Sequence, residues 1–147
     1  MPAQLIVFER DGHWAAALRR EFDFAGVRVT VSEARSWDEV WQALGQFPTA
    51  LVAAELTEAG AERLLAALAR VERRHPETAI VVLADRRLAP YRDLLREAGA
   101  LHFLTSPRQL SEVADIVCRR TARFESTAGP AGPLEEIRAN FPWAESE

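Results

Sequence analysis

The residues of this chain best suited to chemistry are acidic side chains that directly follow short apolar runs. Glu9 and Asp11 come after the run at residues 5–8, and Glu55 comes after the run at residues 50–54. Two or three carboxylates held close together suit a hard cation such as Mg²⁺, which prefers oxygen ligands. The alternative is a solvated acidic rim whose charge is offset by nearby arginines. The sequence leaves weak Mg²⁺ binding open, and we assign this group no catalytic role and no metal centre.

Several other chemistries find no support in the sequence. All 18 basic residues are arginine, so any mechanism that needs a lysine ammonium group is excluded. The single cysteine, Cys118, and the three histidines do not form a zinc-ligand spacing. Neither a glycine-rich phosphate loop nor a recognisable nucleophile motif is present. We therefore predict a chain that has no catalytic residues and no cofactor, and that is not an enzyme.

The segments that must position the acidic residues alternate between two patterns. Short apolar runs predict strands, and apolar residues at helical spacing follow each of them. Helices between such strands are typical of parallel pairing, and right-handed crossovers then place helices on both faces of the sheet. In such α/β sheets, ligands bind outside the carboxyl ends of the strands, which is where the acidic residues fall. The five predicted strands cover residues 5–8, 27–31, 50–54, 79–83 and 101–104.

Length and composition favour one domain followed by a tail. The chain has 147 residues, of which 48% are hydrophobic and 27% charged, as in an ordinary globular domain. We place the domain at residues 1–125 and a linker and tail at residues 126–147, where Gly129 to Gly132 break the pattern. A short helix is predicted within the tail at residues 133–141. Four residues of the tail are candidate binding anchors: Leu134, Ile137, Phe141 and Trp143.

The charge and the ends of the chain bear on partners and compartment. A formal net charge of -4 gives no electrostatic reason to expect nucleic acid or a membrane as partner. The first residues lack the basic start and apolar run of a signal peptide, and no apolar run approaches the ~20 residues that span a bilayer. We expect a cytoplasmic chain.

The segment Glu97–Pro107, which reads Glu-Ala-Gly-Ala-Leu-His-Phe-Leu-Thr-Ser-Pro, follows four β-α units of ordinary length. Together they resemble the receiver domain of two-component response regulators over about residues 4–124. The resemblance implies a flavodoxin-like (βα)5 three-layer sandwich whose parallel sheet has the strand order 2-1-3-4-5. It also implies a site with an acidic pair after the first strand, an aspartate phospho-acceptor after the third, a threonine or serine after the fourth and Lys-Pro after the fifth.

The chemistry of that family does not carry over to this chain. The acidic pair falls on Phe8 and Glu9, so one carboxylate that would hold Mg²⁺ is lost. The hydroxyl position falls on Ala84 and the lysine position on Ser106, so the groups that hold the phosphoryl oxygens are missing. The degenerate phospho-acceptor pocket consists of Glu9, Asp11, Glu55, Ala84 and Ser106.

Two positions of this pocket have more than one interpretation. Glu55 is either a built-in mimic of a phosphorylated state or, as we favour, a polar residue at a strand end that pairs with an arginine. Ser106 either caps a helix that has Pro107 at its first position and Gln109 at its third, or, as the resemblance implies, precedes a cis peptide bond. The arginines available to Glu55 are Arg10, Arg86 and Arg87.

The sequence keeps the β-α pattern of a receiver domain but lacks several residues of its phosphorylation site. This combination favours a non-catalytic, phosphorylation-independent signalling module that acts through protein–protein interaction. In the family, the face built from the fourth helix, fifth strand and fifth helix commonly mediates dimerisation, which implies a protein partner or a second copy there. The alternatives are an atypical receiver that accepts phosphate on Glu55 or Asp11 or binds Mg²⁺, and a domain that binds a small ligand or cofactor. On this chain the interaction face includes Arg92, Arg96, Phe103, Arg119 and Arg120.

Overall fold

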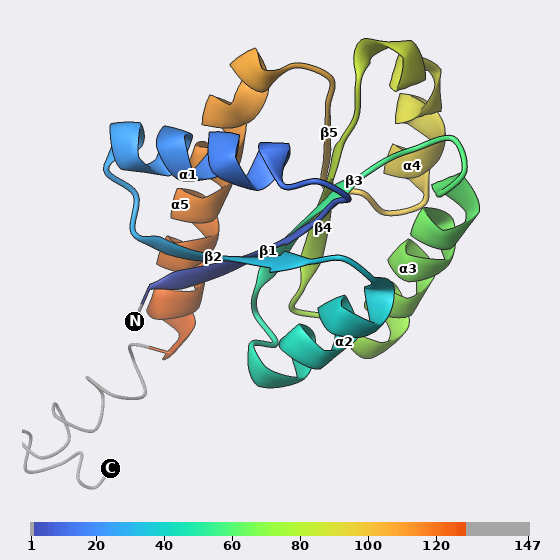
Figure 1. Cartoon of the computed structure of the whole chain (residues 1–147). Coiled ribbons are helices and arrows are strands. Elements are labelled where there is room, and N and C mark those ends of the chain that lie inside the picture. The colour runs from blue at the N-terminus through green and yellow to red at the C-terminus, as the bar shows by residue number, and fades with distance from the viewer. Residues whose placement is uncertain (1, 129–147) are drawn as a thin grey trace, which may run out of the picture.

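The computed structural model describes residues 2–128 and is built around one parallel sheet. The strand order is β2-β1-β3-β4-β5, with all pairs parallel, as can be followed in Figure 1. The predicted α/β fold class and the strand order 2-1-3-4-5 are confirmed. The strands are β1 (Ala3–Phe8), β2 (Val29–Ala34), β3 (Leu51–Glu55), β4 (Ala79–Leu83) and β5 (His102–Leu104).

Helices cover both faces of the sheet and give three layers (Figure 1). On one face lie α1 (His13–Ala25) and α5 (Leu110–Ala128). The other face is covered by α2 (Trp37–Gln46), α3 (Ala61–Arg74) and α4 (Arg92–Glu97). Within the described part of the chain, no helix is long and apolar enough to cross a membrane. Short 3-10 segments lead into α4 and α5: η1 (Arg86–Tyr91) and η2 (Pro107–Gln109).

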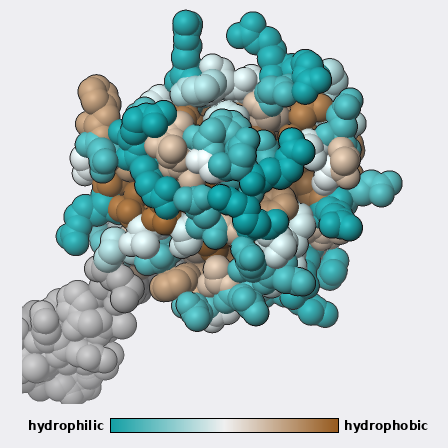
Figure 2. Space-filling model, viewed as in Figure 1, coloured by the Kyte–Doolittle hydropathy of each residue, from teal (hydrophilic) through white to brown (hydrophobic). Residues whose placement is uncertain are grey.

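The apolar strands bury alternate side chains in two separate cores. In β4, Ile80 and Val82 pack on the side of α2, α3 and α4, whereas Val81 and Leu83 pack on the side of α1 and α5. Each fully buried side chain of this size contributes about 1.5–3 kcal/mol. Because side chains alternate along a strand, a run without polar residues is stable only in a sheet covered on both faces. The surface in Figure 2 is mostly hydrophilic, with apolar residues scattered over it.

The start of β2 differs from the prediction, which placed it at Val27. α1 ends at Gly26 in the left-handed conformation, with φ of 70°, and the Val27 amide donates to the Phe22 carbonyl at 3.0 Å. This closing turn of the helix uses the backbone of Val27, so pairing with β1 in the sheet begins at Val29.

The last two helices also differ in their limits. α4 begins only at Arg92, because Pro90 lies in the preceding 3-10 segment and has no amide hydrogen to donate within a helix. α5 continues to Ala128, past residue 125, where we placed the domain boundary. The predicted tail helix at residues 133–141 lies outside the described residues. So do the four candidate anchors, Leu134, Ile137, Phe141 and Trp143.

Candidate functional site at the carboxyl edge of the sheet

The carboxyl ends of the strands meet at one edge of the sheet, where the following loops enclose a hollow of about 360 Å³. Glu55 and Ala84 line this hollow. Backbone hydrogen bonds align the loops, because the Leu56 amide donates to the Leu83 carbonyl at 2.8 Å. The Ala84 amide donates to the Leu104 carbonyl at 2.9 Å. The remaining members of the predicted pocket, Glu9, Asp11 and Ser106, do not line this hollow.

Glu9 caps the start of α1 with its carboxylate. Its side chain is 1% exposed, and its two carboxylate oxygens accept hydrogen bonds from the amides of Trp14 (2.9 Å) and Ala15 (2.8 Å). Gly12, in the left-handed conformation with φ of 90°, reverses the chain so that the helix start meets this carboxylate. A negative charge at a helix N-terminus is stabilised by the unpaired amides there. Glu9 is therefore not part of a solvated acidic rim.

Asp11 pairs with His13 at the start of α1. His13 Nδ1 lies 2.6 Å from Asp11 Oδ1, and both side chains are exposed. This hydrogen bond lowers the pKa of Asp11 and raises the pKa of His13. His13 Nδ1 also lies 3.8 Å from Glu9 Oε1.

The three carboxylates for which the sequence leaves weak Mg²⁺ binding open do not gather in one group. Among the described residues, the one group of three potential ligands within 4.8 Å of one another is Glu9, Asp11 and His13, without Glu55. Both oxygens of Glu9 already accept amide hydrogens, and Asp11 already pairs with the histidine. A set of two engaged carboxylates and an imidazole does not suit Mg²⁺, which prefers oxygen ligands.

Glu55 is half-buried at the end of β3, and it pairs with a backbone amide rather than with a guanidinium group. Its Oε1 accepts from the Arg10 amide at 3.2 Å. Arg87, one of the expected partners, instead binds Asp85, with Nη2 3.0 Å from Oδ2. That contact lowers the pKa of Asp85. Glu55 thus contacts Arg10, one of the three arginines proposed as its partner, but through the main-chain amide and not through the guanidinium group.

Neither Ala84 nor Ser106 offers a group to a ligand in the hollow. Ala84 is 1% exposed and has no polar side chain. The Ser106 Oγ accepts from the Arg108 amide at 3.2 Å and so caps η2, with Pro107 at its first position. No cis peptide bond occurs among residues 2–128, so the capping interpretation is confirmed and the cis alternative is wrong. Gln109 Oε1 accepts from the Thr105 amide at 2.8 Å, which closes the same turn.

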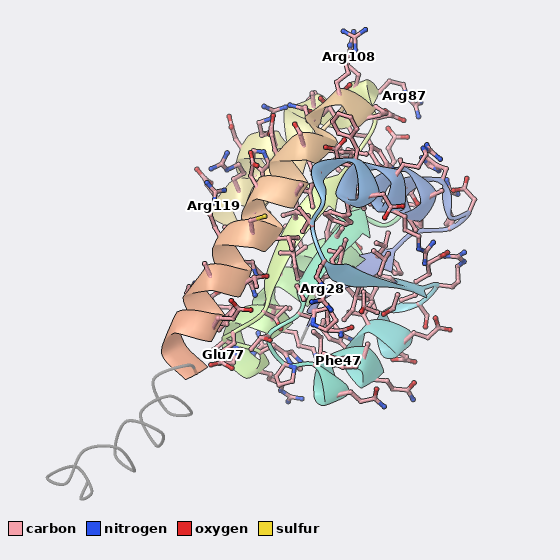
Figure 3. The ribbon with its side chains drawn as sticks, turned by 90° about the vertical axis from the view of Figure 1, so that its left-hand side faces the viewer. Arg28, Phe47, Glu77, Arg87, Arg108 and Arg119 are labelled. Atoms are coloured by element: carbon pink, nitrogen blue, oxygen red, sulfur yellow. The ribbon has the colours of Figure 1, made fainter. Side chains whose placement is uncertain are left out.

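The predicted interaction face is only partly assembled. Phe103 is 2% exposed and therefore packs in the core, with the Arg92 guanidinium 5.4 Å from its ring centroid. Arg120 turns to the opposite edge of the sheet, where it donates to the carbonyls of Thr49 (3.0 Å) and Glu77 (2.8 Å). In Figure 3, Glu77 lies near one end of the molecule, and Arg87 and Arg108 lie near the other. Arg96 and Arg119 remain exposed on α4 and α5.

A second feature of the carboxyl edge was missed by the sequence analysis. A groove of about 810 Å³ runs between α2 and α3 and reaches the ends of β1 and β3. Its wall includes Phe8, Trp37 and Trp41. The two tryptophans lie four residues apart, a spacing that is equally typical of core packing on a helix. The sequence therefore contains no sign of a groove wall, which becomes visible only where Phe8 stacks on Trp37.

No family model matches the sequence, and no curated protein has a significantly similar sequence. Solved structures share the fold. A CheY-like protein, TadZ, from Pseudomonas aeruginosa PAO1 has a TM-score of 0.63 at 18% identity, covering 80% of this chain and 98% of that one. A response regulator from Thermotoga maritima has a TM-score of 0.65 at 19% identity, covering 83% and 99%.

A third solved neighbour is described as an atypical orphan response regulator with a phosphorylation-independent regulatory mechanism. It has a TM-score of 0.60 at 15% identity, covering 80% of this chain and 93% of that one. The chain therefore has the CheY-like fold of response-regulator receiver domains. Identities this low show the fold alone, and the chemistry of the edge must be argued from its own residues.

Proposed function

We propose that this chain is a cytoplasmic, receiver-like signalling module that does not accept a phosphoryl group and acts through contacts with a protein partner. One observation carries the proposal: Glu9, the carboxylate that ends β1, is buried under the start of α1 with both oxygens engaged. A receiver needs carboxylates at this place to hold Mg²⁺ beside its acceptor. Here the carboxylate stabilises the scaffold.

The rest of the edge supports the same conclusion. Phosphoryl transfer depends on positioning and on charge stabilisation of the transferred group. Ala84 has no hydroxyl, Ser106 is engaged with its own turn, and the sequence contains no lysine. Glu55 would attack from a longer side chain than aspartate and already accepts the Arg10 amide. Nothing among these groups would hold the oxygens of a phosphoryl group.

The test is the intact mass of the protein after incubation with acetyl phosphate and Mg²⁺, with Glu55→Ala and Asp11→Ala variants alongside and a conventional receiver as positive control. We expect no phosphoryl adduct on this chain under conditions that label the control. An adduct that disappears in only one of the two variants would identify an acceptor and refute the proposal.

For the partner contact, we propose the exposed part of the predicted face, around Arg96 on α4 and Arg119 on α5. Exposed arginines are common at protein interfaces because they combine charge with a long apolar stem. Light scattering of the wild type over a range of concentrations tests self-association. We expect a dimer that the double variant Arg96→Glu/Arg119→Glu abolishes and Arg108→Glu, a charge change elsewhere on the surface, leaves intact. A monomer at every concentration, or a dimer unaffected by the double variant, would contradict this face.

A further inference from the structure

The groove between α2 and α3 lies where the order of the strands reverses. β1 lies between β2 and β3 in the sheet, so the chain moves to one side of β1 after β1 and to the other side after β2. Residues that follow β1 and residues that follow β3 line the groove. Figure 1 shows α2 and α3 on the same face of the sheet beside these strands. In open α/β sheets this reversal of strand order opens a crevice in which ligands bind. The volume of about 810 Å³ falls within the range of roughly 300–1,000 Å³ typical of small-molecule sites.

One wall of the groove is a continuous stack of aromatic rings. Ring centroids are separated by 4.4 Å between Phe8 and Trp37 and by 5.5 Å between Trp37 and Trp41. His75 extends the stack, with its ring 5.5 Å from Trp41 and inclined by only 5°. Rings stacked in this way form a rigid apolar wall, in which neighbouring rings cover much of each indole face. Both indoles are half-buried, so part of each still faces outward.

The same groove carries four guanidinium groups. The Arg70 guanidinium lies over the Trp41 ring, 4.3 Å from its centroid. Arg35 is held by Glu33, with Nη2 2.8 Å from Oε1. Among residues 2–128, the guanidinium groups of Arg10 and Arg63 have no hydrogen-bond or ion-pair partner. Guanidinium groups without a partner can bind an anion beside the aromatic wall.

Most acidic residues of the groove are engaged by other groups. Glu9 and Glu55 accept backbone amides, and Asp38, at the start of α2, is the third carboxylate of the lining. With Glu33, which pairs with Arg35, the carboxylates equal the guanidinium groups in number, but Glu9 and Glu55 are engaged by amides whereas Arg10 and Arg63 are exposed. The two exposed guanidinium groups are therefore the charges of the groove that an anionic ligand would meet.

We propose that this groove binds a nucleotide, with its phosphates on Arg10 and Arg63 and its base against the wall formed by Trp37, Trp41 and the stacked Arg70. Guanidinium groups match the geometry of phosphate oxygens and donate two parallel hydrogen bonds to them. A planar base can stack on the Arg70 guanidinium that lies over Trp41 and pack against the ring edges of the wall, contacts that a simple inorganic anion does not use.

The change that removes the receiver chemistry also builds this groove. Phe8 stands where the resemblance places a carboxylate, and its ring is the first of the aromatic stack. A carboxylate there would repel phosphates and would leave Trp37 stacked on Trp41 alone. The inference is independent of the proposed signalling function, since a module that accepts phosphate elsewhere on the edge could still bind a nucleotide here.

The experiment is calorimetric titration of the whole protein at low ionic strength with ATP and GTP. Adenosine and inorganic pyrophosphate serve as the base-only and phosphate-only arms, and a hexaglutamate peptide represents an acidic protein segment. The variants are Arg10→Ala, Arg63→Ala and Trp41→Phe, with Arg108→Ala as the control, because Arg108 is an exposed arginine on η2 at the other side of the sheet. Arg10 and Arg63 are exposed, so their replacement leaves the fold intact, which urea unfolding verifies.

We expect at least one nucleotide to bind more tightly than either adenosine or pyrophosphate. Arg10→Ala and Arg63→Ala should each weaken that binding about tenfold or more, the effect of losing a charge-assisted hydrogen bond, while Arg108→Ala leaves it unchanged. The proposal is overturned if neither nucleotide binds at millimolar concentration, or if the arginine variants bind as the wild type does. It is also overturned if pyrophosphate binds as tightly as the nucleotides, or if the hexaglutamate peptide binds more tightly than both.

Discussion

Replacement of Glu9 by glutamine changes the contact on which the proposal of a receiver-like module without phosphoryl transfer rests. The carboxylate accepts two amides at the start of α1, at 2.9 and 2.8 Å, and is almost completely buried. Glutamine keeps the size of the side chain and one acceptor oxygen. Its NH2 group, however, faces one of the two helix amides. Two donors then face each other, and neither has an acceptor.

The magnitude follows from these contacts. Losing one hydrogen bond to a charged acceptor costs about 1.5–3 kcal/mol, and a buried donor left unsatisfied costs about 1–3 kcal/mol. A neutral amide is easier to bury than a carboxylate, which offsets part of the loss. We expect the free energy of unfolding to fall by about 2–3 kcal/mol, equivalent to a drop in Tm of roughly 6–10 °C for a domain of this size.

Urea unfolding followed by far-UV circular dichroism measures the change. Amide NMR signals of Trp14 and Ala15, which should shift and exchange faster in the variant, show that the helix cap is responsible. The matched control is Glu58→Gln, an exposed glutamate at the same edge, which should change stability by less than about 0.5 kcal/mol. If Glu9→Gln were as stable as the control and the two amide signals did not move, the capping role of Glu9 would be refuted.

Two further predictions concern groups whose partners the structure identifies. NMR titration should show the pKa values of His13 and His75 shifted in opposite directions. The hydrogen bond to Asp11 raises the pKa of His13 above 6.5. Burial, together with the nearby charges of Arg70 and Arg74, lowers the pKa of His75 below 6.5. The stability from His13 is therefore complete below pH 6.5 and lost as pH rises through its raised pKa, whereas the stability from neutral His75 is present above pH 6.5 and lost as pH falls through its lowered pKa. Asp11→Asn should return His13 toward its ordinary pKa, and a His13 pKa at or below that value in the wild type would contradict the pairing. Arg120→Ala removes two hydrogen bonds to the carbonyls that precede β3 and β4 and should cost about 1–3 kcal/mol in urea unfolding. Arg119→Ala on the exposed side of the same helix serves as its control, and equal effects of the two variants would show that these contacts do not stabilise the fold.

The fold was predictable because the signals that specify it are local. The strand predicted at residues 79–83 is β4, with the same limits. Its neighbours in the chain are helices with apolar residues at helical spacing, and the alternation of the two patterns leaves few topologies for a parallel sheet. Boundaries were less certain where the backbone competes with the pattern, as at Val27, whose amide closes the end of α1.

The candidate site was predictable in its location but not in its contacts. Residue order places Glu9, Glu55 and Ala84 at the carboxyl ends of strands, and the structure has them there. The direction of a side chain depends on what lies beside it after folding. Glu9 has the sequence position of an edge carboxylate, yet the turn at Gly12 brings unpaired helix amides to it, and these engage both of its oxygens.

The contacts of Arg120 and of the groove wall depend on residues that are far apart in the sequence. Arg120 donates to carbonyls 71 and 43 residues away, contacts that no sequence pattern indicates. The groove wall joins the end of β1 to two tryptophans of α2 and a histidine at the end of α3, segments that share no sequence pattern. By itself, the sequence determined the (βα)5 scaffold and the residue types at the ends of its strands, because both depend on the order and spacing of residues along the chain. Only the tertiary structure decided which charges are engaged and which are free, because hydrogen bonds and ring stacking depend on distances that packing of the layers sets.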